Sequence, residues 1–134
     1  MVEGMNMGRK CPWTKAELKS LYDRLETYTK ALTMRLVATE GIKSSMEAMR
    51  AYNMFKYPVV YVFTHYHYGR FEDLGMTDSD ISSYVQLYGM MAQHFTEGVL
   101  EGLQTSDVFY YDQKKELSPL LENVCREVLY ILKN

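Results

Sequence analysis

His65 and His67 come closest to a recognisable chemistry, because two neighbouring imidazoles can share a metal ion. On a β-strand the two rings would lie on one face, whereas on an α-helix a separation of two residues places them about 200° apart. No Glu-x-x-His motif or set of cysteine ligands accompanies the pair. Since the flanking residues favour a helix, we predict no metal site here.

A second interpretation gives His67 a role in polar recognition. His67 repeats with apolar residues at helical spacing, and a histidine on such a stripe is more often a hydrogen-bonded core residue than a ligand. The functional alternative places His67, with Arg70 or His94, at the mouth of an apolar pocket, where a few polar groups orient a ligand. The sequence leaves both interpretations open.

The motifs of nucleophilic catalysis and of phosphate binding are missing from the sequence. There is no Gly-x-Ser-x-Gly elbow or Gly-rich phosphate loop, and neither Cys11 nor Cys125 has a neighbouring base. The two cysteines have no metal-ligand or redox spacing, so we interpret both as free thiols. Carboxylates such as Glu97 and Glu101 are spaced as on a hydrated surface. We therefore expect a protein that senses or binds and is not an enzyme.

Length and composition bound the fold and the partners. The 134 residues, 47% of them apolar, fit an irregular segment 1–13 followed by a single helical domain 14–134. A formal charge of -2 argues against nucleic acid as a partner, since phosphate binding needs clustered Lys and Arg. No apolar run reaches the length of a membrane span and no signal-peptide pattern is present, so we expect a cytoplasmic protein.

Two helices are expected before residue 58. Thr14 and Glu17 form a capping box, and the leucines that follow repeat in steps of three and four, which predicts a helix over 14–38. A second capping box at residues 44–47 begins a short helix. This helix should end before Pro58, because the residue that precedes a proline is steered away from helical geometry.

Residues 57–75 are ambiguous between strand and helix. The run from Val59 to Thr64 has high strand propensity. Pro58 fits the first turn of a helix, however, and Gly75 fits the position after its last turn. Apolar residues and one histidine also repeat at helical spacing (Val60, Phe63, His67, Phe71, Leu74). We therefore predict a helix here.

The longest helix is predicted from Thr77, its cap, to Leu103. Gly98 and Gly102 lie inside it at a cost of about 1 kcal/mol each relative to Ala. A close helix crossing at Gly98-x-x-x-Gly102 is the simpler explanation. A ligand or a partner helix against exposed backbone is the functional one.

A short helix is expected after residue 108, and Ser118-Pro119 should begin the last helix. The apolar residues of segment 120–132 cover more than half of the helix circumference, which is wider than one core-facing stripe requires. Either the helix is central in the fold, or its surplus face forms a homodimer interface (Leu121, Val124, Val128, Ile131).

A ligand pocket is predicted between the helices 57–75 and 77–103. Ten Met, twelve Tyr and five Phe make a soft, aromatic interior that suits either a pocket or a loosely packed core. If the two helices pack antiparallel, their apolar stripes would enclose one acyl chain (Phe63, His67, Phe71, Tyr88, Met91, Phe95). A carboxylate head group would then bind His67, Arg70 or His94.

The stretch 51–63, which reads AYNMFKYPVVYVF, and the following His65-Tyr66-His67-Tyr68 resemble a known family. The chain is similar to the haem-less, globin-fold sensor domains of sporulation histidine kinases in spore-forming bacilli. It resembles in particular the free-standing sporulation-inhibitory versions, which consist of the sensor domain without a kinase. The helix order fits over the span from Thr14 to Leu132.

The resemblance implies an all-α, globin-like bundle of five to six helices that binds a fatty acid in place of haem, with chloride as a further candidate ligand. It also implies a homodimer through the last helices, and inhibition of sporulation signalling by mimicry of the kinase's sensor domain. His65, His67 and His94 each lie in a predicted helix and could ligate iron in principle. We expect no haem, because the family lacks it. The alternatives are an immunity- or antitoxin-type interaction module and a haem-binding globin.

Overall fold

The structure is a computed structural model that describes residues 10–40, 53–105 and 111–134. Within these ranges the chain is helical and contains no strand, which confirms the predicted all-α class. Five α-helices alternate with short 3-10 or π segments. Their order is α1 (Lys15–Glu40), η1 (Met54–Lys56), α3 (Tyr57–His67), η2 (Phe71–Leu74), α4 (Asp78–Ser83), η3 (Tyr84–Tyr88), α5 (Ala92–Thr105) and α6 (Tyr111–Lys133).

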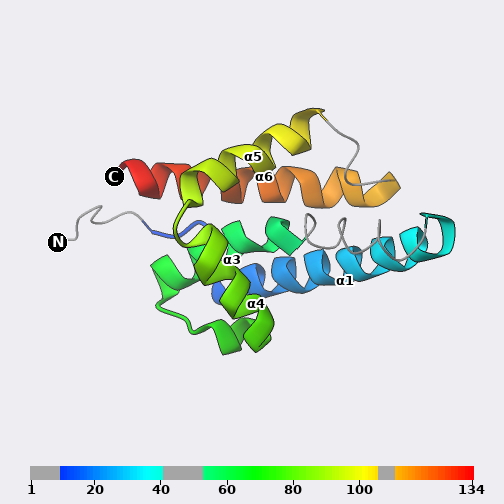
Figure 1. Cartoon of the computed structure of the whole chain (residues 1–134). Helices are drawn as coiled ribbons and strands as arrows, with labels where there is room; N and C mark the ends of the chain where they lie inside the picture. Colours follow the sequence, from blue (N-terminus) through cyan, green and yellow to red (C-terminus); the bar gives the residue numbers. More distant parts are fainter. Residues whose placement is uncertain (1–9, 41–52, 106–110) are drawn as a thin grey trace.

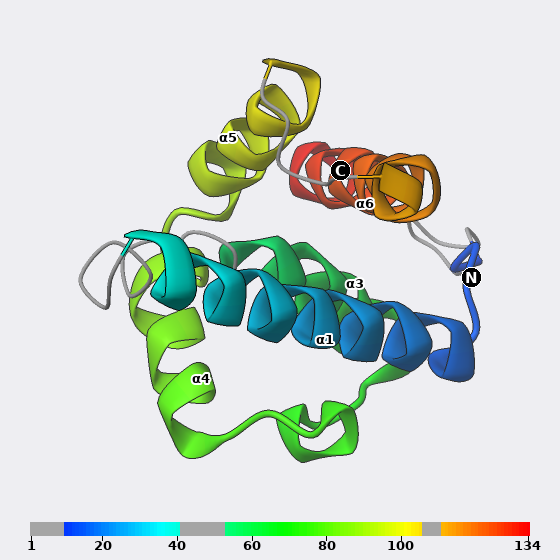
Figure 2. The same cartoon turned by 90° about the vertical axis from the view of Figure 1, so that its right-hand side faces the viewer.

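The helices are arranged in layers around α3. α6 packs against both α5 and α3, and α3 packs in turn against α1. Figure 2 shows α5 and α6 on one side of the α1–α3 layer and α4 on the other. In Figure 1 the helices α1 and α6 run along the length of the molecule. The core therefore lies where α3 is covered by α1 and α6.

The predicted capping box begins α1 as expected. The backbone N–H of Thr14 donates to Oε1 of Glu17 at 2.8 Å, and the N–H of Glu17 donates to Oγ1 of Thr14 at 3.1 Å. These two bonds satisfy donors that the first helical turn would leave unpaired. The helix ends at Glu40, slightly beyond the predicted end at Ala38. The second predicted capping box, at residues 44–47, lies outside the described residues.

The ambiguous segment after Pro58 forms a helix, but a shorter one than predicted. α3 ends at His67, and Tyr68 adopts the left-handed conformation with φ 52°. The next residue, Gly69, lies against the buried ring of Phe63, where an added Cβ would come within 1.8 Å of Cε1. The expectation of one helix to Gly75 is therefore wrong, because the chain turns at a close contact that helical periodicity does not report.

The segment predicted as the longest helix is divided in two. Thr77 caps α4 as expected, since its hydroxyl accepts from the N–H of Asp80 at 3.1 Å. The chain then widens into the π turn η3, where the N–H of Gly89 donates to the carbonyl of Tyr84 at 2.7 Å. α5 begins only at Ala92. The longest described helix is α1, with 26 residues.

Gly98 does not mark a close helix crossing. A Cβ built on Gly98 would meet no described atom within 4 Å. The crossing interpretation is wrong at this position, because α5 packs on α6 through a different face. The backbone at Gly98 is exposed instead.

α6 begins earlier than predicted and takes a central place. It starts at Tyr111, so Pro119 lies inside the helix although a proline cannot donate the usual backbone hydrogen bond. Leu121, Val124 and Val128 have no exposed surface, and Ile131 is half-buried. The wide apolar face therefore serves the core of one chain, and the three buried residues are not available to a second copy.

The buried core draws on every layer of the fold. Its largest fully buried side chains come from α1, α3, the segment around η2 and η3, and α6 (Tyr22, Tyr88, Leu18, Leu25, Leu74, Leu117, Leu121, Val59, Val60, Val62, Val124, Val128).

No helix in the described ranges has the length and apolar character that crossing a membrane requires.

Candidate ligand-binding cleft

The predicted pocket residues do not share one site. Phe63 and Tyr88 are buried in the core, with exposed fractions of 2% and 0%. Phe71 and Phe95 are half-buried, while Met91 is half-exposed. Phe63 and Tyr88 are thus core residues, and the ring of Tyr88 stacks on that of Tyr84 with centroids 5.5 Å apart.

α3 contacts η3, the segment after α4, through a face other than the one that carries Phe63 and His67. The rings of Tyr57 and Tyr84 lie 5.4 Å apart, and those of Tyr61 and Tyr88 lie 6.3 Å apart, both edge to face. Phe71 adds a tilted contact with Tyr84 at 5.5 Å. Such contacts between aromatic rings contribute about 0.5–1.5 kcal/mol each beyond area burial. Tyrosine side chains, and not Phe63 and His67, therefore form the packing contact between α3 and η3.

Burial of this tyrosine cluster changes its acid–base behaviour. Desolvation raises the pKa of Tyr84 and of Tyr88 well above the ordinary value, because the phenolate form is poorly solvated there. Burial also raises the pKa values of Tyr57 and Tyr61. The cluster is thus neutral at physiological pH and acts as packing with polar tips.

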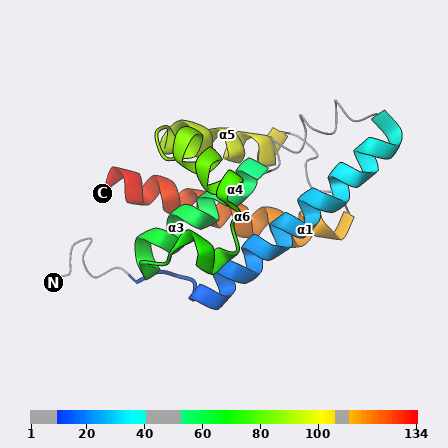
Figure 3. The same ribbon diagram turned by 60° about the horizontal axis from the view of Figure 1, so that its bottom comes forward.

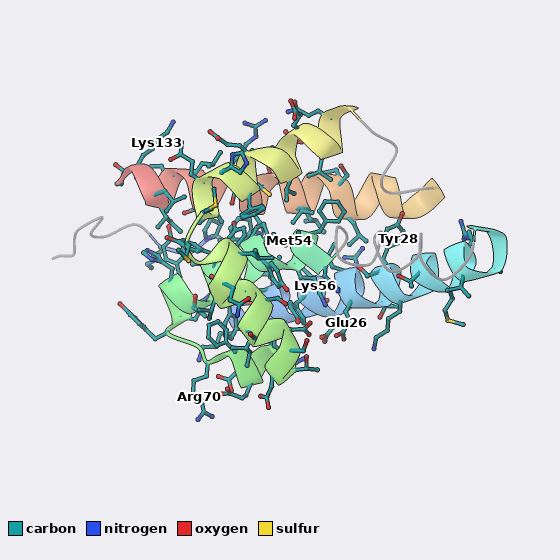
Figure 4. All side chains as sticks on the ribbon, in the orientation of Figure 1. Glu26, Tyr28, Met54, Lys56, Arg70 and Lys133 are labelled. Atoms are coloured by element: carbon teal, nitrogen blue, oxygen red, sulfur yellow. The ribbon has the colours of Figure 1, made fainter. Side chains whose placement is uncertain are left out.

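Three predicted polar anchors lie apart from one another. The Nε2–H of His67 donates to the backbone carbonyl of Trp13 at 2.9 Å, so this histidine tethers the N-terminal segment. Arg70 is exposed, and a terminal nitrogen of its guanidinium lies 3.8 Å from Oδ1 of Asp73. Figure 4 shows the Arg70 side chain pointing away from the body of the protein. His94 is exposed on α5.

An open cleft lies at the break between η3 and α5. Its volume is about 560 Å³. Its walls come from α3, from the break itself, from the first turns of α5 and from the end of α6 (Tyr61, Gly89, Met90, Met91, Ala92, Gln93, His94, Glu97, Leu132). Two of the predicted ligand residues, Met91 and His94, therefore share a site, although not the site that was expected.

Apolar side chains are unusually exposed around this cleft. Met90 is 80% exposed, Met91 51% and Leu132 39%. Methionine side chains are flexible and polarizable, so they adapt to the shape of an apolar ligand. A site of this size lies within the range of about 300–1,000 Å³ that is usual for small molecules. The cleft can accept an apolar chain along its wall.

Polar groups complete the rim of the cleft. The Nε2 of Gln93 donates to a carboxylate oxygen of Glu97 at 3.4 Å. His94 packs edge to face on Phe95, with ring centroids 5.7 Å apart, and it is exposed. Of the three predicted anchors, only His94 lines this cleft. The rim of the cleft therefore carries an imidazole, an amide and a carboxylate beside the two methionines.

The buried Lys56 forms a separate polar cluster. Its ammonium lies 3.9 Å from a carboxylate oxygen of Glu26 and 5.1 Å from the ring centre of Tyr22. Figure 4 shows the Lys56 and Glu26 side chains next to each other. Burial lowers the pKa of Lys56, while the charges of Asp80 and Glu26 oppose that shift. No local sequence pattern predicts this cluster, because it depends on the packing of α1 against η1.

Sequence reasoning missed Met90, Tyr61 and Leu132 as cleft residues. The signal that could have found the site was Gly89-Met90-Met91, where a glycine precedes two large apolar residues. π turns such as η3 also occur frequently beside functional sites. Leu132 had no local signal, because its place depends on how α6 packs.

The fold and the cleft define this chain as an all-helical domain with an open, methionine-lined site of ligand size. No family model, curated protein or solved structure matches the chain. The geometry of the cleft is therefore the structural basis for assigning a function.

Proposed function

We propose that this protein is a non-enzymatic sensing domain that binds a fatty acid along the cleft between η3 and α5. The observation that carries the proposal is the cleft of about 560 Å³, in which exposed Met90 and Met91 adjoin His94. The methionines contact the acyl chain, and His94 hydrogen-bonds the carboxylate.

The energetics support an amphipathic ligand over a fully polar one. Each methylene withdrawn from water contributes about 0.8 kcal/mol, and a hydrogen bond to a charged partner adds about 1.5–3 kcal/mol. Because the cleft is open, only part of a chain is covered. Its affinity is therefore lower than that of an enclosed tunnel, which suits a reversible sensor.

The position of the cleft supports a sensing role. A ligand there contacts Tyr61 of α3, Leu132 of α6 and the residues that follow η3. A bound ligand would thus contact three segments that are distant in the sequence at the same time. A ligand that favours one arrangement of these segments shifts the protein toward it.

The finer identity of the protein rests on the family resemblance alone. It comprises a globin-like arrangement without haem, chloride as a second ligand, a cytoplasmic homodimer, and inhibition of a sporulation sensor histidine kinase by mimicry of its sensor domain. Because Leu121, Val124 and Val128 are buried, such a dimer would use other surfaces of the chain.

Titration of the delipidated protein with dodecanoate tests the fatty-acid proposal. We expect Met91→Asp to weaken binding by at least tenfold, because it places a charge in the apolar wall. Met34→Asp on α1 is the matched control, since Met34 is 73% exposed and does not line the cleft. Equal affinity in wild type and Met91→Asp would place the ligand elsewhere.

A protein-interaction module, of the immunity or antitoxin type, is the second candidate. Val85 and Leu87 of η3, a few residues before Met90 in the chain, are also exposed. Exposed apolar side chains that gather in a patch mark protein interfaces. Failure of the wild-type, delipidated protein to bind dodecanoate would favour this candidate.

The other alternative is a haem-binding globin. A globin would show a Soret band in the purified protein. If no Soret band appears even after haem is added, this alternative is excluded.

A further inference from the structure

The two methionines of the cleft between η3 and α5 are accessible to small solutes. Met90 is 80% exposed and Met91 is 51% exposed, and both line the cleft. Figures 1 and 3 both show the start of α5 beside the C-terminal part of α6, which is drawn in red, and the cleft lies there. A solute therefore reaches these side chains without any opening of the fold.

The other methionines that the structure describes differ in accessibility. Met76 is almost fully buried, with 7% exposed, and Met54 is partly buried against the core. Met34 on α1 is 73% exposed, but it does not line the cleft. Within the described part of the chain, the accessible thioethers are therefore those of Met34, Met90 and Met91, and the last two belong to the cleft.

The two thiols of the chain compete poorly for an oxidant. Cys11 is half-buried, and desolvation raises the pKa of its thiol. Cys125 is buried, and desolvation raises the pKa of its thiol to about 12. The thiolate is the form that attacks a peroxide, and a raised pKa makes this form scarce at neutral pH. A thioether has no proton to lose, so its oxidation does not depend on such a shift.

We propose that reversible oxidation of Met90 and Met91 to methionine sulfoxide regulates ligand binding in the cleft. The regulation rests on the proposed function, because it acts on the fatty-acid site. Hydrogen peroxide transfers one oxygen atom to the thioether sulfur, so that the O–O bond breaks and an S–O bond forms. The sulfur loses two electrons, the peroxide gains them, and the second oxygen leaves with both hydrogens as water.

The oxidation is reversible by a thiol-dependent reductase. Methionine sulfoxide reductases return the sulfoxide to the thioether, with one enzyme for each sulfoxide epimer. Two thiols supply the two electrons and form a disulfide, and the oxygen leaves as water. The state of the cleft would thus follow the balance between peroxide and thiol reductants.

Oxidation changes the wall of the cleft where the acyl chain would lie. The thioether is apolar and polarizable, whereas the sulfoxide is polar and chiral. A methylene that covers the sulfoxide oxygen withdraws it from water without offering a hydrogen bond, which is unfavourable. The net charge of the protein does not change. The oxidised protein should therefore release a fatty acid that the reduced protein binds.

Treatment of the full, delipidated chain with hydrogen peroxide tests the proposal. Peptide mapping by mass spectrometry measures oxidation at each methionine, and titration with dodecanoate measures the affinity before and after treatment. We expect sulfoxide at Met90 and Met91 and a loss of affinity of about tenfold or more. A mixture of the two epimer-specific reductases, with dithiothreitol as the thiol, should restore the affinity.

Matched leucine variants identify the sulfur atoms that are responsible. Met90→Leu combined with Met91→Leu keeps apolar side chains of similar size but removes both thioethers. This double variant should bind dodecanoate within about threefold of wild type, and peroxide should not change its affinity. Met34→Leu removes the accessible sulfur outside the cleft and should respond to peroxide as wild type does. An equal loss of affinity in the double variant and in wild type would overturn the proposal.

Two further outcomes separate the oxidation from the fatty-acid site itself. Untreated wild-type protein that binds no dodecanoate contradicts the fatty-acid site, and with it any regulation of that site. Untreated protein that binds, and binds equally well after Met90 and Met91 are fully oxidised, contradicts only the regulation. Met90 and Met91 that stay unoxidised while Met34 is converted would contradict their accessibility in the cleft.

Discussion

The hydroxyls of Tyr88 and Thr96 share a hydrogen bond across the break between η3 and α5. Both side chains are fully buried, so neither hydroxyl can bond to bulk water instead. The pair joins the end of the π turn to the second turn of α5. It thereby fixes the intervening residues 89–91, which form the wall of the proposed fatty-acid cleft.

Replacement of Thr96 by valine tests this link. The side chains have the same shape, but Thr96→Val leaves the Tyr88 hydroxyl without this partner in a buried position. We expect the free energy of unfolding to fall by about 1–3 kcal/mol, measured by urea denaturation. Thr27→Val, at an exposed position of α1, is the comparison and should change it by less than about 0.5 kcal/mol. If Thr96→Val left the free energy of unfolding unchanged, the hydrogen bond between Tyr88 and Thr96 would not contribute to stability.

Two glycines are expected to respond in opposite ways to alanine. Gly69→Ala places a Cβ 1.8 Å from Cε1 of Phe63, a ring that is 2% exposed and cannot move freely. We expect a loss of about 1–3 kcal/mol. Gly98→Ala meets no described atom within 4 Å in the middle of α5 and should stabilise the protein by about 0.5–1 kcal/mol. Thermal unfolding of both variants checks the pair, and a tolerated Gly69→Ala would contradict the turn after α3.

Stability should decline in alkaline solution. Burial raises the pKa of Tyr84 above 10.0, so the folded protein keeps a proton that the unfolded chain releases. The contribution of Tyr84 to the free energy of unfolding is fully present below about pH 10 and is lost as the pH rises further. Lys56 has the opposite sign, since its lowered pKa makes stability rise with pH up to about 10.5.

Thermal unfolding between pH 8 and pH 12 separates these effects. We expect the melting temperature to fall above pH 10, and to fall less steeply in Tyr84→Phe than in wild type. Tyr68→Phe is the control, because Tyr68 is 88% exposed. Parallel curves for wild type and Tyr84→Phe would contradict the burial of this phenol.

The parts of the fold that local chemistry controls could be predicted from the sequence. The capping box at Thr14 and the cap at Thr77 depend on neighbouring residues, and both are confirmed. The end of α3 and the early start of α6 could not be predicted. Gly69 responds to the ring of Phe63, and Pro119 lies inside a helix whose packing on α3 and α5 offsets the missing bond.

The candidate site was predictable only in part, for a related reason. Helical spacing placed Phe63 and Met91 on apolar stripes, but it does not say which stripe faces which neighbour. Met91 and His94 line the cleft, whereas Phe63 faces the core. Leu132 reaches the same cleft from the far end of the sequence, a contact that depends on tertiary packing.

Native mass spectrometry can detect a fatty acid in the cleft, because it measures the mass of a bound ligand and the number of chains together. The protein should be delipidated, mixed with dodecanoate and compared with Met91→Asp under the same conditions. We expect one dodecanoate per wild-type chain and a strongly reduced bound fraction in the folded Met91→Asp variant. Wild-type protein that stays entirely free of dodecanoate, or equal occupancy in both proteins, would contradict fatty-acid binding in the cleft.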